Sequence, residues 1–266
     1  ASDVYKRQDK NPPKLKKRSR VGELSNDIEK HPDFIKIEKF AFEKFGLAAM
    51  SHRHGVFGMQ QPLPPIVKYG LTFLFVQSEF GLCCPLSMTD SLTRTLTKFG
   101  DKTLIDKFFD QLTSQDLDHL FQGAMFMTEQ HAGSDVGSID TYAEYEDGNW
   151  FLTGDKWFCS NPDADLAMVL ARHNKTISGT KGLALFLLPK KLENGDLNNY
   201  EIIRLKDKLG GRSFASGEIK LNRAFAYLVG NPDEGFKQMT DMINMSRLSN
   251  GVRASGMMQR LSLIHI

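Results

Sequence analysis

The stretch MTEQHAGSDV, residues 127–136, lies between two runs with strand-like patterns. Residues 121–127 are mostly apolar, and residues 138–146 alternate between polar and apolar positions, as a half-buried strand does. The stretch itself carries hydroxyls at Thr128 and Ser134 and a glycine. Such a turn lets backbone N–H groups approach an anion or a flat polar ring. A tight strand connection without a ligand explains the same composition, because Gly and Ser are ordinary turn residues.

Two further motifs follow in order. GDKWFCSN, residues 154–161, comes one strand later, and KLGGRS, residues 208–213, opens another strand. The order and spacing of the three segments resemble the acyl-CoA dehydrogenase family from about residue 31 to about residue 260. Within that family, DKWF at 155–158 and KDKLGGRSFAS at 206–216 most resemble the AidB-like (alkylation-response) branch.

Hydrophobic periodicity predicts an α+β fold with three parts. Residues 31–120 have helical spacing and form an N-terminal helical domain. Residues 121–230 are short β runs separated by turn residues, which predicts a middle β-barrel or β-sandwich domain. Helical spacing returns over residues 231–266, and the resemblance makes this the first helix of a C-terminal bundle.

Local signals place some helix boundaries. Ser87 followed by Asp90 predicts a capping box at the start of one helix, and Asp101 predicts the cap of the next. His52 and His54 have no ligand spacing with a carboxylate, so we expect a loop or surface role for them and no metal site.

Residues 1–30 are expected to form a disordered basic tail. Residues 10–20 are basic, contain two prolines and lack apolar periodicity, so a solvated linker is favoured over a nucleic-acid-contacting arm. Residues 1–8 and 261–266 resemble translated sequencing-adapter ends and are expected to be foreign. We therefore expect the natural protein to be longer and the chain to be a C-terminally truncated fragment.

Composition narrows the class of protein. A net charge of +2 implies no polyanionic partner. No apolar run reaches the roughly 18 residues of a membrane span. Three cysteines make neither a disulfide framework nor a zinc spacing, so a reducing, cytoplasmic location is expected. Without a G-x-G-x-x-G motif, a nicotinamide-binding domain is not expected.

The resemblance implies FAD as the cofactor, held by hydroxyls and backbone at the polar edge of the flavin and by an aromatic on its face. Phe158 matches the aromatic, Ser160 the hydroxyl near flavin N5, and Thr128 the group at the polar edge. The residues implied to contact the cofactor are Met125, Met127, Thr128, Gly133, Ser134, Phe158, Cys159 and Ser160. Ser134 and Arg247 are implied to contact substrate.

Acyl-CoA dehydrogenation also needs a carboxylate that removes the α-proton. Some family members carry it directly before the arginine that Arg247 matches, and that position is Ser246 here. Glu129 belongs to the flavin loop and is not expected to be the base. We therefore assign no catalytic residue, expect the base in a missing C-terminal part, and expect the fragment alone to be inactive and to retain FAD weakly.

The function that the resemblance implies is α,β-dehydrogenation of an acyl-CoA thioester in fatty acid metabolism, with hydride transfer to flavin. The implied partners are acyl-CoA and an electron-transfer flavoprotein or similar acceptor, in a homo-oligomer, as a homotetramer, without a membrane. An AidB-like FAD protein that binds DNA with little dehydrogenase activity is one alternative. An acyl-CoA oxidase is another, since the sequence does not show oxygen access to the flavin.

Overall fold

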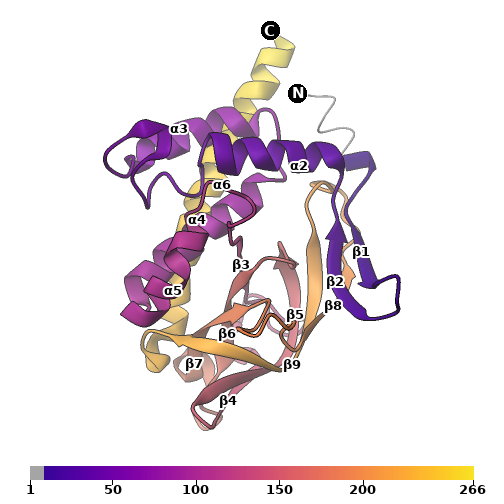
Figure 1. Ribbon diagram of the computed structural model, residues 1–266, viewed down its shortest axis with the longest axis vertical. Helices are drawn as coiled ribbons and strands as arrows, with labels where there is room; N and C mark the ends of the chain where they lie inside the picture. Colours follow the sequence, from indigo (N-terminus) through magenta and orange to yellow (C-terminus); the bar gives the residue numbers. More distant parts are fainter. Residues whose placement is uncertain (1–8) are drawn as a thin grey trace.

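The computed structural model describes residues 9–266, so the foreign segment expected at residues 1–8 lies outside the described part. Helices gather at one end of the molecule and strands at the other, and one long helix runs along both (Figure 1). The α+β fold expected from the sequence is confirmed, with a helical N-terminal part, a barrel-like sheet and a helical C-terminal segment.

The helical part packs around its own apolar cluster, which is built on Phe42, Met50 and Leu82. Its helices are α2 (Pro32–Lys39), which runs on into a π-helical turn η1 (Phe40–Lys44), then α3 (Pro65–Val76), α4 (Cys83–Phe99) and α5 (Lys102–Leu112). Short 3-10 helices lie in the connections: η2 (Val56–Gly58), η3 (Val136–Ser138), η4 (Gly179–Gly182) and η5 (Pro232–Glu234).

One predicted cap is confirmed and one is wrong. The Asp101 carboxylate accepts from the Leu104 N–H at 2.8 Å and begins α5. Ser87 does not cap α4, because the helix already begins at Cys83. The preceding turn is instead held by the buried Glu79, whose carboxylate accepts from the N–H groups of Gly81 and Leu82 at 2.8 and 2.5 Å.

The expected disordered tail is wrong for residues 14–29. They form an antiparallel hairpin of β1 (Lys14–Arg18) and β2 (Leu24–Glu29). The hairpin lies beside the barrel because Leu15 and Ile28 pack on the barrel core. Its buried Asn26 donates to the Tyr200 carbonyl at 2.9 Å and accepts from the Ile202 N–H at 3.0 Å. These contacts are long-range, so a pattern of basic residues could not reveal them.

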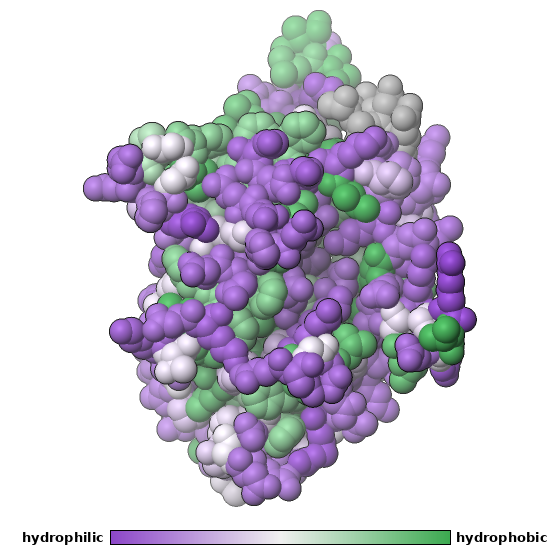
Figure 2. All heavy atoms as spheres, in the orientation of Figure 1, coloured by the Kyte–Doolittle hydropathy of each residue, from purple (hydrophilic) through white to green (hydrophobic). Residues whose placement is uncertain are grey.

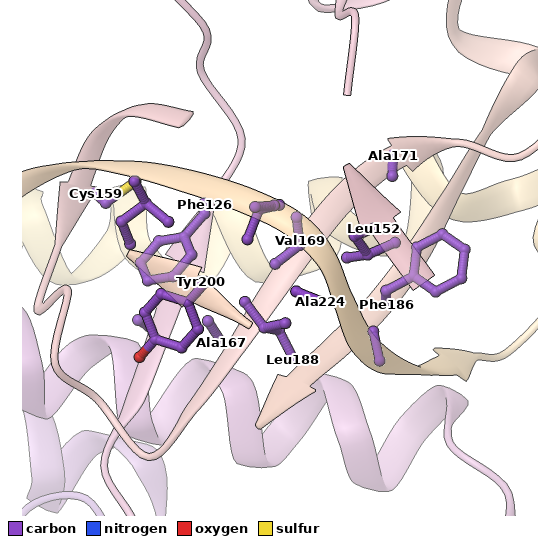
Figure 3. Close-up of a cluster of buried hydrophobic side chains, with 14 of the residues drawn as sticks. Phe126, Leu152, Cys159, Ala167, Val169, Ala171, Phe186, Leu188, Tyr200 and Ala224 are labelled. Carbon is purple, nitrogen blue, oxygen red and sulfur yellow. The ribbon is translucent and has the colours of Figure 1, made fainter. Parts of the chain in front are cut away.

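Within the described residues, the large sheet has seven strands in the order β3-β5-β4-β6-β7-β9-β8, and extra β3–β6 and β5–β9 pairings close it into a small barrel. The strands are β3 (Gly123–Phe126), β4 (Tyr142–Glu146), β5 (Asn149–Ser160), β6 (Leu166–Arg172), β7 (Leu183–Pro189), β8 (Tyr200–Leu205) and β9 (Ser216–Val229). Phe126, Cys159, Phe186 and Tyr200 point into the interior, where they form its core (Figure 3).

The long helix α6 (Gly235–His265) joins the two parts. Its first turns pack Met239 and Met242 on the sheet. Further along, Gly256 lies against α3, and a Cβ there would come within 2.7 Å of the Phe73 carbonyl oxygen, so only glycine allows this approach. The last turns project from the molecule and expose apolar side chains (Figure 2). No helix within residues 9–266 has the length and apolar character needed to cross a bilayer.

Candidate functional site

Strand β5 carries a β-bulge at Trp157 and Phe158. Lys156 pairs with Ile219 of β9, whereas Cys159 pairs with Gly217, so β5 has one more residue than its partner over this interval. A bulge bends a strand and redirects side chains, and bulges are common next to functional sites. Here Phe158 is 58% exposed between the buried Lys156 and Cys159. The bulge therefore presents an open aromatic face.

Cys159 and its neighbours lie on opposite faces of the strand. Cys159 is fully buried in the barrel core, while Phe158 and Ser160 face outward. Ser160 pairs with Met125 of β3, whose side chain, with that of Met127, packs on the apolar layer between sheet and helices. We call Trp157, Phe158 and Ser160 the aromatic platform. Of the predicted cofactor contacts, Cys159 can offer only its backbone.

The loop at 127–136 is attached to the platform. The Trp157 N–H donates to the Thr128 carbonyl at 2.8 Å. Gly133 and Ser134 are exposed on the same loop and hydrogen-bond to no other described residue. A Cβ added at Gly133 would meet no atom within 4 Å, so packing inside the chain does not require glycine there. Thr128 therefore adjoins the platform directly, whereas Gly133 and Ser134 are linked to it only through the loop.

A buried ion pair fixes the base of this loop. The Lys156 ammonium donates to the Glu129 carboxylate at 2.7 Å, to the Leu170 carbonyl at 2.8 Å and to the Met127 carbonyl at 3.3 Å. Glu129 also accepts from the N–H groups of Asp140 and Thr141, at 2.6 and 3.1 Å. All three ammonium protons thus have acceptors, which is the condition under which a buried pair is tolerated.

The same contacts decide the role of Glu129. Burial by itself raises the pKa of the Glu129 carboxyl, but the Lys156 ammonium and the donated hydrogen bonds outweigh this and hold the pKa below its usual range. A carboxylate held in this way is a poor proton acceptor at neutral pH. The structure therefore gives Glu129 a positioning role, consistent with its exclusion as the base.

Sequence reasoning missed several groups next to Ser160. Cys84, at the start of α4, lies near Ser160, and burial raises the pKa of its thiol. Lys206 lies 3.3 Å from the Trp157 ring centroid and 4.7 Å from that of Phe158. Ser216 pairs with Ser160 across β5 and β9. Local sequence gave no signal for these contacts, because each residue comes from a different element.

Arg247 does not contact the platform in the described residues. It is exposed on α6, and its guanidinium bonds the Asn244 side chain at 3.3 Å. The arginine of α6 that faces inward is Arg253, which is buried near Cys84 and lies over the Phe80 ring. The substrate contact of Arg247 stays a prediction.

Comparisons with known proteins identify the family. The chain matches two family models, the adaptive response protein AidB N-terminal domain over residues 3–119 and the acyl-CoA dehydrogenase middle domain over residues 124–224. It is 36% identical over 217 residues to acyl-CoA dehydrogenase family member 11 of Caenorhabditis elegans, covering 77% of this chain and 35% of that protein. It is 31% identical over 268 residues to the putative acyl-CoA dehydrogenase AidB of Escherichia coli (strain K12), covering 94% and 46%.

A solved structure gives the same result. The crystal structure of Caenorhabditis elegans ACDH-11 in complex with C11-CoA superposes with a TM-score of 0.85 at 30% identity, covering 97% of this chain and 44% of that chain. The chain belongs to the acyl-CoA dehydrogenase family, in its AidB-like branch. It spans less than half the length of either curated relative.

Proposed function

We propose that this chain provides the FAD platform of an acyl-CoA dehydrogenase that acts on acyl-CoA thioesters. The observation that carries the proposal is the bulge that exposes Phe158 beside Ser160 and the Thr128 loop. An aromatic ring open to solvent, next to hydroxyl and backbone donors, has the chemistry that a flat heteroaromatic ring with polar edges needs.

The donor set fits FAD. When bound, FAD supplies the hydride acceptor for the α,β-dehydrogenation. Phe158 would stack on the flavin, Ser160 and Thr128 would donate to its polar edge, and Ser134 would meet a phosphate-bearing part of a ligand. Preplaced donors stabilise negative charge without having to reorganise. Glu129 and Lys156 hold the donors in place and take no part in proton transfer.

Binding of acyl-CoA is supported by one structural relative, ACDH-11, whose crystal structure is that of a complex with C11-CoA. An electron-transfer flavoprotein or similar acceptor, and assembly as a homo-oligomer, remain part of the same proposal. The AidB-like alternative, DNA binding with little dehydrogenase activity, is supported by the match to the AidB N-terminal domain. An oxidase reaction is the third alternative, and activity with oxygen as the sole electron acceptor separates it from the other two.

Titration of the 266-residue chain with FAD tests the proposal, because binding quenches or shifts flavin fluorescence even where retention is weak. Phe158→Ala should weaken binding about fivefold, since a stacking contact contributes roughly 1 kcal/mol. Phe40→Ala is the matched control, because Phe40 is 55% exposed on the helical part. If both variants bind FAD as the unmodified chain does, Phe158 is not a flavin platform.

A further inference from the structure

A groove borders the aromatic platform at the loop between β8 and β9. It has a volume of about 200 Å³ and is lined by Pro12, Pro13, Leu205, Lys206, Asp207, Lys208, Arg212, Phe214, Ala215 and Ser216. Ser216 pairs with Ser160, and Lys206 lies over the Trp157 and Phe158 rings. The groove and the platform are therefore parts of one continuous surface.

The three cations of the groove differ in how their charge is balanced. Lys206 is paired with the Glu218 carboxylate at 2.6 Å. Arg212 lies 3.7 Å from Asp207, whose side chain is 94% exposed, so this pair is weak. Lys208 has no carboxylate at ion-pair distance within residues 9–266.

The hydrogen-bond partners of the Lys208 ammonium are uncharged groups. Its ammonium donates to the Phe214 carbonyl at 2.7 Å and to the Ser216 hydroxyl at 3.3 Å, and it lies 3.4 Å from the Phe214 ring centroid. The Ser216 hydroxyl accepts this bond and keeps its own proton for a further acceptor. Removing an ammonium partly from water without a counter-ion costs free energy, and a bound anion would offset that cost.

We propose that this groove binds a phosphate or pyrophosphate group of a nucleotide ligand, with Lys208 as the principal contact and with Ser216 and Arg212 as secondary contacts. The proposal rests on the proposed function for its choice of nucleotide, which is FAD or the CoA part of the substrate. Both carry phosphate, and both would have to pass beside the platform.

The charge state of Lys208 gives the groove a pH dependence. Burial lowers the pKa of Lys208 to about 8, opposed by Cys84 on α4 and Asp9 in the N-terminal segment. The other charged groups of the groove are Lys206, Arg212 and Asp207. The ammonium is protonated below about pH 8, so anion binding should weaken as the pH rises through that value.

The test is calorimetric titration of the full chain and of Lys208→Met with inorganic pyrophosphate, CoA, FAD and riboflavin. Lys220→Met is the matched control, since Lys220 is exposed on β9 outside the groove. We expect Lys208→Met to weaken pyrophosphate binding about tenfold, because a hydrogen bond to a charged group is lost, and to leave riboflavin binding unchanged. If Lys208→Met loses affinity for FAD alone or for CoA alone, that result shows which nucleotide the groove binds.

A second titration uses sulfate, which does not change its charge between about pH 7 and about pH 9. Affinity should fall across this range in the unmodified chain and stay flat in Lys208→Met. Melting curves of both variants check that the fold is kept.

Equal pyrophosphate affinity in Lys208→Met and Lys220→Met would overturn the proposal, and so would the absence of any pyrophosphate, CoA or FAD binding by the unmodified chain. Should pyrophosphate binding depend on Lys208 while neither riboflavin nor FAD binds, the groove stands and the flavin function fails.

Discussion

Two buried lysine–carboxylate pairs, one under the barrel loop and one in the helical part, use the same chemistry in different surroundings. Lys156 and Glu129 meet at 2.7 Å, and Lys68 and Asp90 meet at 2.6 Å. The second pair is extended by His52, which lies 2.9 Å from Asp90. His52 lies in a loop, as expected, but it is not on the surface and it does have a carboxylate partner. All these side chains are nearly inaccessible to solvent.

The difference lies in what each pair holds. The Asp90 cluster joins the loop at His52, α3 and α4, so it fixes helix packing. The Glu129 pair lies between the barrel and a loop whose residues from 133 to 135 are exposed. A buried ion pair can therefore support a ligand site only when one of the segments that it orders is open to a ligand, as the loop after Glu129 is.

The largest expected effect follows from Lys156→Met, which leaves the Glu129 carboxylate buried without its counter-ion. We expect the free energy of unfolding to fall by about 4 kcal/mol, as for other broken buried pairs, and FAD affinity to fall as well. Urea denaturation measures the first and flavin fluorescence the second. The double variant Lys156→Met/Glu129→Gln should lose less unfolding free energy than the sum of the losses in the two single variants. Full additivity would show that the two groups do not interact.

Lys68→Met is the matched experiment in the helical part. Asp90 keeps its His52 contact, so we expect a smaller loss, about 3 kcal/mol. FAD affinity, measured on the folded fraction, should be unchanged. A loss of FAD affinity equal to that of Lys156→Met would remove the distinction drawn between the two pairs.

Lowering the pH should reduce the stabilisation that each of the two pairs contributes. His52 and Lys68 outweigh the effect of burial and hold the pKa of Asp90 below its usual range, as Lys156 does for Glu129. A folded-state pKa below the unfolded one gives stability above about pH 4 that is lost as the pH falls through the folded value. Glu129→Gln should therefore show a shallower loss of unfolding free energy than the unmodified chain as the pH falls below about 5. An unchanged slope would mean that Glu129 titrates normally.

Phe158→Ala separates ligand binding from stability at the platform. Because Phe158 is 58% exposed, its truncation should change the free energy of unfolding by less than about 1 kcal/mol. The FAD titration described above should still report the loss of stacking. A large drop in melting temperature would identify the ring as a packing residue instead.

The smallest stability effect is expected for Arg247→Ala, within about 0.5 kcal/mol, because the side chain is exposed on α6. If Arg247 contacts substrate as predicted, affinity for an acyl-CoA should fall while FAD affinity stays constant. Lys237→Ala, also exposed on α6, is the control. Equal acyl-CoA affinity in the two variants would remove Arg247 from the site.

Most patterns confined to one element were read correctly from the sequence, with the Ser87 cap as the exception. The periodicities gave the change from helices to strands and back, and Asp101 gave one helix start. The resemblance had included Cys159 among the cofactor contacts, whereas the structure places its side chain in the barrel core, on the face opposite Phe158 and Ser160. The hairpin at residues 14–29 was missed because it depends on contacts with residues distant in the sequence. The true start of α4 was missed although the Glu79 turn before it is local.

The order of helical and strand parts and the family could be read from the sequence alone, because these follow from short-range periodicity and from motifs in a fixed order. Folding in three dimensions was needed to show that a bulge exposes Phe158, that Lys156 is bound to Glu129, and that Lys208 has no carboxylate at ion-pair distance among residues 9–266. The physical reason is that exposure and charge balance are properties of the neighbours that folding brings together, and those neighbours lie far apart along the chain.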